Sequence, residues 1–141
     1  MADPPTTAEP IIRFEGVRMA FGDQVVLEDL TVDLAAGETS VIMGPSGVGK
    51  SVFLKLLVGL MSPDAGHIWV SGVDVTRARE PELRAVRKRL GMLFQDGALF
   101  DSMTVGENVA FPLRRHTRKR DPEIHDLVAD QLERVGLPGV E

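Results

Sequence analysis

Apolar and polar residues alternate in two stretches near the start of the chain. The apolar positions are Ile12, Phe14, Val17, Met19 and Phe21 in the first stretch and Leu30, Val32 and Leu34 in the second. This period of two predicts antiparallel strands with one buried face, joined through a turn at Gly22-Asp23. Residues 39–43 (Thr-Ser-Val-Ile-Met) end in a continuous apolar run, which predicts a strand buried on both faces.

The pattern then changes to alternating helices and strands. Residues 51–58 predict a helix that ends at Gly59. A short strand near 67–71 follows, then a helix from Pro81 to about Arg89 and a second buried strand over 90–94. The spacing of Thr104 and Glu107 predicts a capping box, and hence a helix that Pro112 interrupts. A last helix carries one apolar face: Ile124, Leu127, Val128, Leu132 and Val135. The order indicates an α/β fold with an antiparallel opening and a mostly parallel core.

Composition narrows the class of protein. The chain has 141 residues, of which 43% are hydrophobic and 26% charged, so the chain as a whole is not disordered. It contains no cysteine, which excludes disulfides and thiolate metal sites. A net charge of −5 argues against a nucleic-acid partner.

Residues 1–10 are rich in proline, which predicts a flexible tail. They lack the features of a signal peptide, and no apolar run is long enough to span a bilayer, so we expect a cytoplasmic protein.

Positive charge is concentrated in two places. Residues 77–89 contain six bases and two acids, and residues 114–120 contain five bases and no acid. These segments are either solvated surface or docking sites for an acidic partner or for anionic lipid headgroups.

The strongest chemical signal is a complete phosphate loop of the form G-x-x-x-x-G-K-[ST]. It consists of Gly44, Pro45, Ser46, Gly47, Val48, Gly49, Lys50 and Ser51. Its glycines allow consecutive N–H groups to point at phosphate oxygens, and the following helix directs the positive end of its dipole at the same anion. Lys50 would contact the β- and γ-phosphates, and the Ser51 hydroxyl could ligate Mg²⁺. The sequence therefore predicts nucleotide binding.

Two further residues are candidates for this site. Gln95 directly follows the predicted strand 90–94, where its amide could reach Mg²⁺ or orient the attacking water. It could equally be a surface glutamine that begins a loop. Phe21 could stack on an adenine ring, and a core phenylalanine is as plausible from the sequence alone.

Together these segments resemble the ATP-binding subunit of ABC transporters. The resemblance rests on Phe21-Gly22, the phosphate loop, residues 62–68 (Ser-Pro-Asp-Ala-Gly-His-Ile) and residues 91–95 (Gly-Met-Leu-Phe-Gln), and it extends from Ile11 to the end. It implies that Phe21 is the adenine-stacking aromatic, that residues 44–51 are the Walker A motif, and that Gln95 is the Q-loop glutamine. It also implies the cofactors ATP and Mg²⁺, transmembrane permease subunits and a homodimer of ATPase subunits as partners, and a peripheral location on the inner face of the cell membrane.

Residues 94–114 look like the Mla/Mce branch of this family, which moves phospholipids or other lipids across the cell envelope. The motifs behind this resemblance are Gln-Asp-Gly-Ala-Leu-Phe, Ala-Phe-Pro-Leu-Arg and Ser-Val-Phe-Leu-Lys from Ser51. We therefore expect a role in lipid transport, with a non-lipid substrate as the alternative.

Other family motifs are missing from the sequence. No Ser-Gly-Gly signature occurs, and residues 127–130 (Leu-Val-Ala-Asp) fit a helical period better than a Walker B strand. His67, His116 and His125 lie upstream of the position of a switch histidine and are expected to be ordinary surface residues. The expectation is thus the N-terminal portion, residues 11–141, of a longer ATPase, truncated before the signature helix and the Walker B strand. Such a fragment should bind nucleotide and hydrolyse it poorly.

Two other classes of protein remain open at this point. A small P-loop kinase or GTPase would need a basic lid, for which residues 114–120 are a candidate. A module that binds nucleotide or permease without chemistry would need only the phosphate loop.

Overall fold

The structure is a computed structural model that describes residues 9–95 and 97–141. It divides after Gly91 into two compact units. The predicted tail over residues 1–10 lies outside the described residues except for Glu9 and Pro10.

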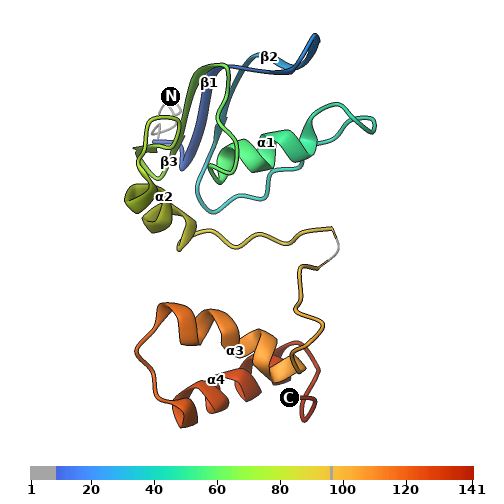
Figure 1. The fold of residues 1–141 in the computed structure, drawn as a ribbon, viewed down its shortest axis with the longest axis vertical. Helices are drawn as coiled ribbons and strands as arrows, with labels where there is room; N and C mark the ends of the chain where they lie inside the picture. Colours follow the sequence, from blue (N-terminus) through green and yellow to red (C-terminus); the bar gives the residue numbers. More distant parts are fainter. Residues whose placement is uncertain (1–8, 96) are drawn as a thin grey trace, which may run out of the picture. The chain divides into compact units, whose positions relative to one another are not determined.

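The first unit is built on a four-stranded antiparallel sheet (Figure 1). Its strands are β1 (Ile12–Phe21), β2 (Gln24–Leu34), β3 (Ala65–Val70) and β4 (Val73–Asp74), in the order β2-β1-β3-β4. The predicted hairpin is confirmed, because Phe21 pairs with Gln24 across a two-residue loop. Gly22 enters this loop with φ +59°, a conformation that a glycine adopts without steric cost.

One helix packs its apolar side against this sheet. Helix α1 (Lys50–Leu57) buries Phe53 and Leu56. The Phe53 ring stacks on Phe14 of β1 with centroids 4.3 Å apart, and Leu56 and Ile68 are fully buried in the same cluster. Burial of this apolar surface is the main force that holds the helix, and with it the preceding loop, on the sheet.

A second helix, α2 (Glu80–Arg87), is tied to the end of the first. The Arg87 guanidinium donates hydrogen bonds to the carbonyl oxygens of Val58 (2.9 Å) and Gly59 (2.7 Å). These carbonyls belong to the end of α1, where the helix itself provides no donors. Arg87 therefore has an internal structural role that its place in a basic segment did not reveal.

The two predicted core strands are not formed. Residues 39–43 and 90–94 have no strand conformation, and the side chains of Val41, Met43 and Leu93 are 75%, 86% and 87% exposed. A strand buried on both faces depends on neighbouring strands for its hydrogen bonds, and none of the described residues pairs with these segments. The expected parallel core is therefore absent from the described part of the chain, where every strand pair is antiparallel.

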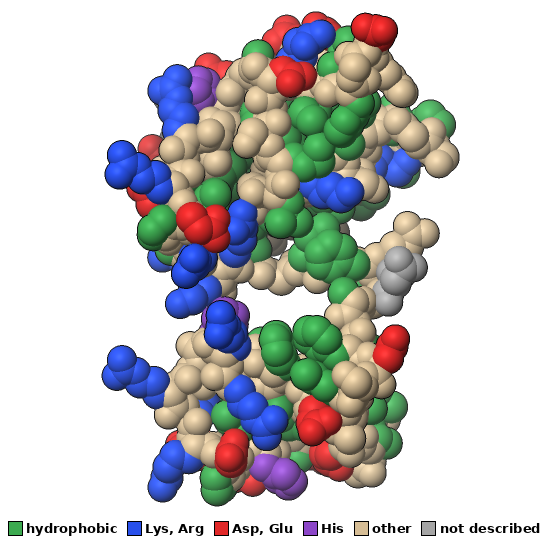
Figure 2. All heavy atoms as spheres, viewed as in Figure 1, with side chains coloured by type: hydrophobic (Ala, Val, Ile, Leu, Met, Phe, Trp, Pro, Cys, Tyr) green, Lys and Arg blue, Asp and Glu red, His purple; other side chains and the backbone are tan. Residues whose placement is uncertain are grey.

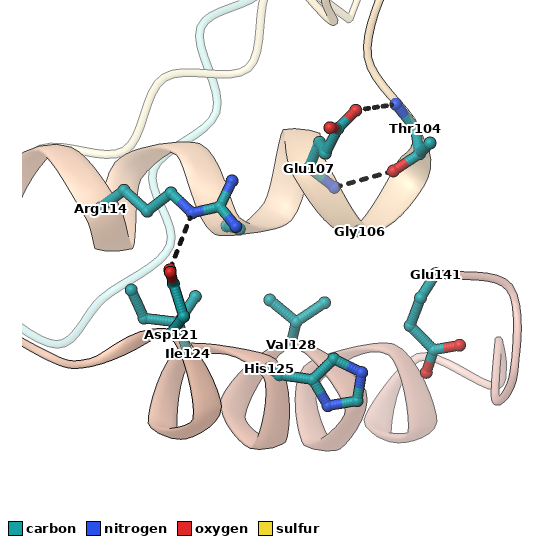
Figure 3. Close-up of a pocket in the computed structure, with 10 residues that line it drawn as sticks. Thr104, Gly106, Glu107, Arg114, Asp121, Ile124, His125, Val128 and Glu141 are labelled. Atoms are coloured by element: carbon teal, nitrogen blue, oxygen red, sulfur yellow. Dashed lines mark hydrogen bonds and ion pairs between the residues drawn. The ribbon is translucent and has the colours of Figure 1, made fainter.

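The second unit is a pair of helices, α3 (Val105–His116) and α4 (Asp121–Arg134). The predicted capping box is confirmed: the Thr104 N–H donates to Glu107 Oε2 (2.8 Å), and the Glu107 N–H donates to Thr104 Oγ1 (3.1 Å) (Figure 3). The helices bury a small apolar cluster: Ala110, Ile124, Val128 and Leu132. A cavity of about 250 Å³ opens beside it, where Arg114 and Asp121 form an ion pair at 3.6 Å.

The expectation that Pro112 interrupts the helix is wrong, because α3 continues to His116 with Pro112 inside it. Proline removes one backbone hydrogen bond from a helix and crowds the carbonyl four residues earlier. On either side of Pro112, Ala110 and Leu113 pack into the cluster with α4, and this packing outweighs the loss.

The three histidines differ in their surroundings. His116 and His125 are exposed, as expected. His67 is instead half-buried on β3, with Nδ1 3.1 Å from Asp74 Oδ2, because the β3–β4 turn folds Asp74 against it. Burial raises the pKa of Asp74, but hydrogen bonds from Thr76 and His67 outweigh this effect, and the net pKa is lowered.

Residues 127–130 lie within α4, which confirms that they are not a Walker B strand.

Candidate functional site

The phosphate loop leads directly into α1. Gly49 is the N-cap residue and Lys50 the first residue of the helix. The Gly49 carbonyl accepts the first helical hydrogen bond, from the Phe53 N–H at 2.9 Å. The amides of a first helical turn have no partner within the helix, and the helix dipole adds partial positive charge there. This end of α1 can therefore receive an anion.

Lys50 folds back over the loop. Its ammonium donates hydrogen bonds to the carbonyl oxygens of Gly44 (2.8 Å) and Pro45 (2.7 Å), so the loop closes into a ring around the side chain. Lys50 is half-buried, whereas Ser51 and the residues from Gly44 to Val48 are exposed. The positive charge is thus held at the loop and remains within reach of a ligand.

The loop is seated on β2 through Gly49. The residue has φ +103°, and a Cβ added there would lie 2.7 Å from Val26 Cγ1 and 3.3 Å from the Val26 carbonyl oxygen. Both the backbone conformation and the lack of space require glycine. The start of α1 and the start of β2 consequently touch, and the phosphate loop has a fixed place on the sheet.

This contact brings Phe21 close to the phosphate loop. Phe21 ends β1 and pairs with Gln24, two residues before Val26. At about 3.4 Å per strand residue, the pairing partner of Phe21 lies roughly 7 Å along β2 from the contact with Gly49. The Phe21 side chain is 48% exposed, so it is not the core residue that the sequence left as an alternative.

An apolar cavity of about 410 Å³ lies beside the loop. Apart from Gly49 and Lys50, its lining is hydrophobic and comes from β2, residues 41–43, Val48 and Phe53. A hydrophobic lining offers few hydrogen-bond donors to a phosphate. The candidate anion site is therefore the exposed side of the loop. Among the described residues, no group of three or more His, Cys, Asp or Glu side chains forms a metal site.

Gln95 lies in a turn rather than at the end of a strand. The turn is closed by a hydrogen bond from the Gly97 N–H to the Phe94 carbonyl oxygen at 3.0 Å, and the Gln95 side chain is exposed. It belongs to the second unit, whereas Phe21 and the phosphate loop belong to the first. Phe21 and residues 44–51 therefore lie together in the first unit, and Gln95 lies in the second.

Comparison of the sequence with models of known protein families identifies the family of this chain. The family described as ABC transporter matches residues 27–141. The chain belongs to the ABC transporter family. The resemblance inferred from the phosphate loop and its surrounding motifs is thereby confirmed. The fold class is confirmed as that of an ABC ATPase cassette with an antiparallel N-terminal sheet, although the expected parallel core is not formed by the described residues.

Relatives within the ABC family are similar over most of the chain. It is 50% identical over 130 residues to the probable ribonucleotide transport ATP-binding protein mkl of Mycobacterium leprae, covering 92% of the chain and 38% of that protein. It is 43% identical over 129 residues to the intermembrane phospholipid transport system ATP-binding protein MlaF of Haemophilus influenzae, covering 92% of the chain and 49% of MlaF. The chain thus spans half or less of the length of these relatives.

Solved ABC cassettes have the same fold. A dimeric ATP-binding cassette in a post-hydrolysis state bound to ADP and Pi superposes with a TM-score of 0.81 at 26% identity, over 91% of this chain and 58% of that one. A cassette of the transporter complex cbiONQ from Clostridium perfringens superposes with a TM-score of 0.78 at 26% identity, over 94% and 53% of the two chains.

Asp64 is a residue near the site that sequence reasoning missed. Its carboxylate accepts a hydrogen bond from the Ala20 N–H at 2.7 Å, one residue before Phe21. The sequence around it, Ser-Pro-Asp-Ala-Gly, contributed to the family resemblance and signals a turn, but it assigned Asp64 no role. No local pattern connects positions that are 44 residues apart.

The contact between Gly49 and Val26 leads to a stability prediction. Gly49→Ala should lower the free energy of unfolding by about 2–4 kcal/mol, because it adds a steric overlap to an unfavourable positive φ. The measurement is chemical denaturation of the purified chain. Gly47→Ala is the matched control, since Gly47 has φ +82° but nothing within 4 Å of an added Cβ.

If the two alanine variants lost the same stability, the close approach to β2 would not matter. The double variant Gly49→Ala with Val26→Ala should recover part of the loss, because it removes the atom that the new Cβ meets.

Proposed function

We propose that this chain binds ATP with Mg²⁺ and acts as part of the ATP-binding subunit of an ABC transporter. The observation that carries the proposal is the seating of the phosphate loop beside Phe21 in one unit. Lys50 and the first amides of α1 would hold the phosphates, and Phe21 would stack on the adenine ring. The cassette solved with ADP and Pi supports this assignment.

Mg²⁺ would be held by few protein atoms. The Ser51 hydroxyl is exposed in the first turn of α1 and is an oxygen ligand of the kind that Mg²⁺ prefers. Phosphate oxygens and water would complete the shell, with Gln95 as a further ligand or as the residue that orients the attacking water. When bound, the ion would neutralise charge on the phosphates.

The transported substrate is proposed from the relatives. The MlaF proteins of Haemophilus influenzae and Escherichia coli, at 43% and 40% identity, are named for phospholipid transport, and this favours a lipid. The mkl protein, at 50% identity, is named for probable ribonucleotide transport, which keeps a non-lipid substrate as the second candidate. Nothing favours a small kinase or GTPase over either.

Partners and location follow the same proposal. A homodimer of ATPase subunits would bind transmembrane permease subunits, and the dimeric cassette structures support the homodimer. No helix in the described residues has both the length and the apolar character that crossing a membrane requires. We propose a peripheral location on the inner face of the cell membrane.

Two bases in each basic segment form ion pairs with nearby acids. In residues 77–89, Arg84 and Arg87 pair with Glu80, and Arg87 also binds backbone carbonyls. In residues 114–120, all seven residues are exposed; Arg114 pairs with Asp121 and Arg120 with Glu123, whereas Arg115, Arg118 and Lys119 form no ion pair with a described residue. Figure 2 shows Lys and Arg side chains standing out from the surface. Because residues 114–120 carry five bases and no acid and are all exposed, we propose that they face anionic lipid headgroups.

Lysine substitution tests the nucleotide site. Lys50→Ala should weaken binding of ATP–Mg²⁺ by about 10- to 100-fold, because it removes a charged donor to phosphate. Isothermal titration calorimetry measures the affinity. Lys55→Ala is the matched control, since Lys55 is exposed in the last turn of the same helix and should leave affinity unchanged. Equal affinity of wild type and Lys50→Ala would show that the loop is not the phosphate site.

Hydrolysis should be weak in the 141-residue chain. The sequence contains no Ser-Gly-Gly signature, and the one candidate for Walker B is a helix. We expect phosphate release near that of Lys50→Ala, which serves as the blank. Turnover typical of a complete ABC ATPase, about 1 s⁻¹ or more and lost in Lys50→Ala, would contradict this expectation.

Vesicle binding tests the basic segment. The double variant Arg118→Glu with Lys119→Glu should weaken binding to vesicles of phosphatidylcholine and phosphatidylglycerol by about 30-fold or more, at roughly 1 kcal/mol per base lost. Lys88→Glu with Arg89→Glu changes the charge equally in the other segment and should have a smaller effect. Equal losses in both double variants would indicate attraction by net charge alone.

A further inference from the structure

Asp64 fastens the end of β1 through both its backbone and its side chain. The Asp64 N–H donates to the Arg18 carbonyl oxygen at 2.9 Å. The Asp64 carboxylate accepts from the Ala20 N–H at 2.7 Å. These two β1 residues are alternate positions, so their hydrogen-bonding groups face the same side of the strand.

The Asp64 carboxylate binds β1 just beyond the point where β3 stops pairing with it. On this side of β1, the last residue that pairs with β3 is Arg18, opposite Ala65. On the other side, β2 pairs with β1 as far as Phe21. Asp64 thus supplies an acceptor in place of a strand carbonyl, and a hydrogen bond to an ionised acceptor is stronger than one between neutral groups.

The surrounding residues hold Asp64 in this place. Gly66 has φ +87°, and a Cβ there would overlap the Gly16 carbonyl, so only glycine lets the chain come this close to β1. The Arg18 guanidinium lies 3.6 Å from Asp64 Oδ2 and 3.6 Å from Glu28 Oε2 on β2. This bridge links Asp64 to the far side of the hairpin.

We propose that Asp64 is a positioning residue for the nucleotide base. It fixes the strand end from which Phe21 projects, and so sets the place of the aromatic ring relative to the phosphate loop. The inference rests on the proposed contact between Phe21 and adenine. Asp64 would keep the Phe21 ring at a fixed position relative to the phosphate loop, which is itself seated on β2.

The need for such a residue follows from the position of Phe21. The ring is 48% exposed and lies at a two-residue hairpin loop, so little packing restrains it. Strand ends open more readily than strand centres. Without the hydrogen bond from Ala20, the last residues of β1 would be held from the β2 side alone.

Calorimetry on the full chain separates base binding from phosphate binding. ATP–Mg²⁺ and inorganic triphosphate–Mg²⁺ are titrated into wild type, Phe21→Ala, Asp64→Ala and Asp64→Asn. Asp64→Ala should weaken ATP about tenfold and leave triphosphate within about twofold, as Phe21→Ala should. Asp64→Asn should restore most of the affinity, because its amide oxygen can accept the same hydrogen bond.

Asp33→Ala is the matched control on the same sheet. Its carboxylate is exposed and pairs with Arg13 at 2.9 Å, and its loss should not change ATP affinity. Unchanged ATP binding in Asp64→Ala, equal loss of ATP and triphosphate, or no rescue by Asp64→Asn would overturn the inference. If Phe21→Ala also bound ATP normally, the base contact itself would be wrong and the role of Asp64 would fall with it.

Amide hydrogen exchange gives a reading that does not depend on any ligand. The Ala20 amide should exchange about tenfold faster or more in Asp64→Ala than in wild type, and at the wild-type rate in Asp33→Ala. An unchanged rate in Asp64→Ala would overturn the inference even if ATP binding fell. A faster rate with normal ATP binding would show that Asp64 holds the strand but does not position the base.

Discussion

The close contact between Gly49 and β2 is the constraint on which the candidate site depends. Gly49 is the N-cap residue of α1 within the phosphate loop, and its φ of +103° with no room for a Cβ seats the loop against Val26. The helix is held from behind by the stack of Phe53 on Phe14. The loop is thereby placed beside the β1–β2 hairpin, whose two-residue turn follows Phe21. Membership of the ABC transporter family supports the proposal that this arrangement binds ATP.

Local signals predicted the helices and the hairpin well. Alternation over β1 and β2 gave both strands, and the Thr104–Glu107 spacing gave the start of α3. Each of these features depends on residues a few positions apart. Pro112 was the exception, because its cost to the helix was predictable whereas the packing of α3 on α4 was not.

The features that could not be predicted from the sequence all depend on residues far apart in the chain. Residues 39–43 and 90–94 have the composition of buried strands, yet a strand forms only where neighbours complete its hydrogen bonds. The chain spans 53–58% of the solved cassettes reported above, and the described residues contain no such neighbours. Arg87 and Asp64 likewise bind backbone groups 28 and 44 residues away. In the site, the motifs and the family resemblance named residues 44–51 and Phe21 as candidates, and the structure brings Phe21 and the loop together in one unit.

The first unit alone is proposed to carry both the phosphate loop and the base-stacking residue of an ATP site. Backbone amide NMR of the 141-residue chain during titration with ATP–Mg²⁺ tests it most directly. We expect saturable shifts for the amides of residues 44–51 together with Phe21, and loss of both sets in Lys50→Ala. Shifts confined to other residues, or shifts in the loop with none at Phe21 or its neighbours, would contradict it.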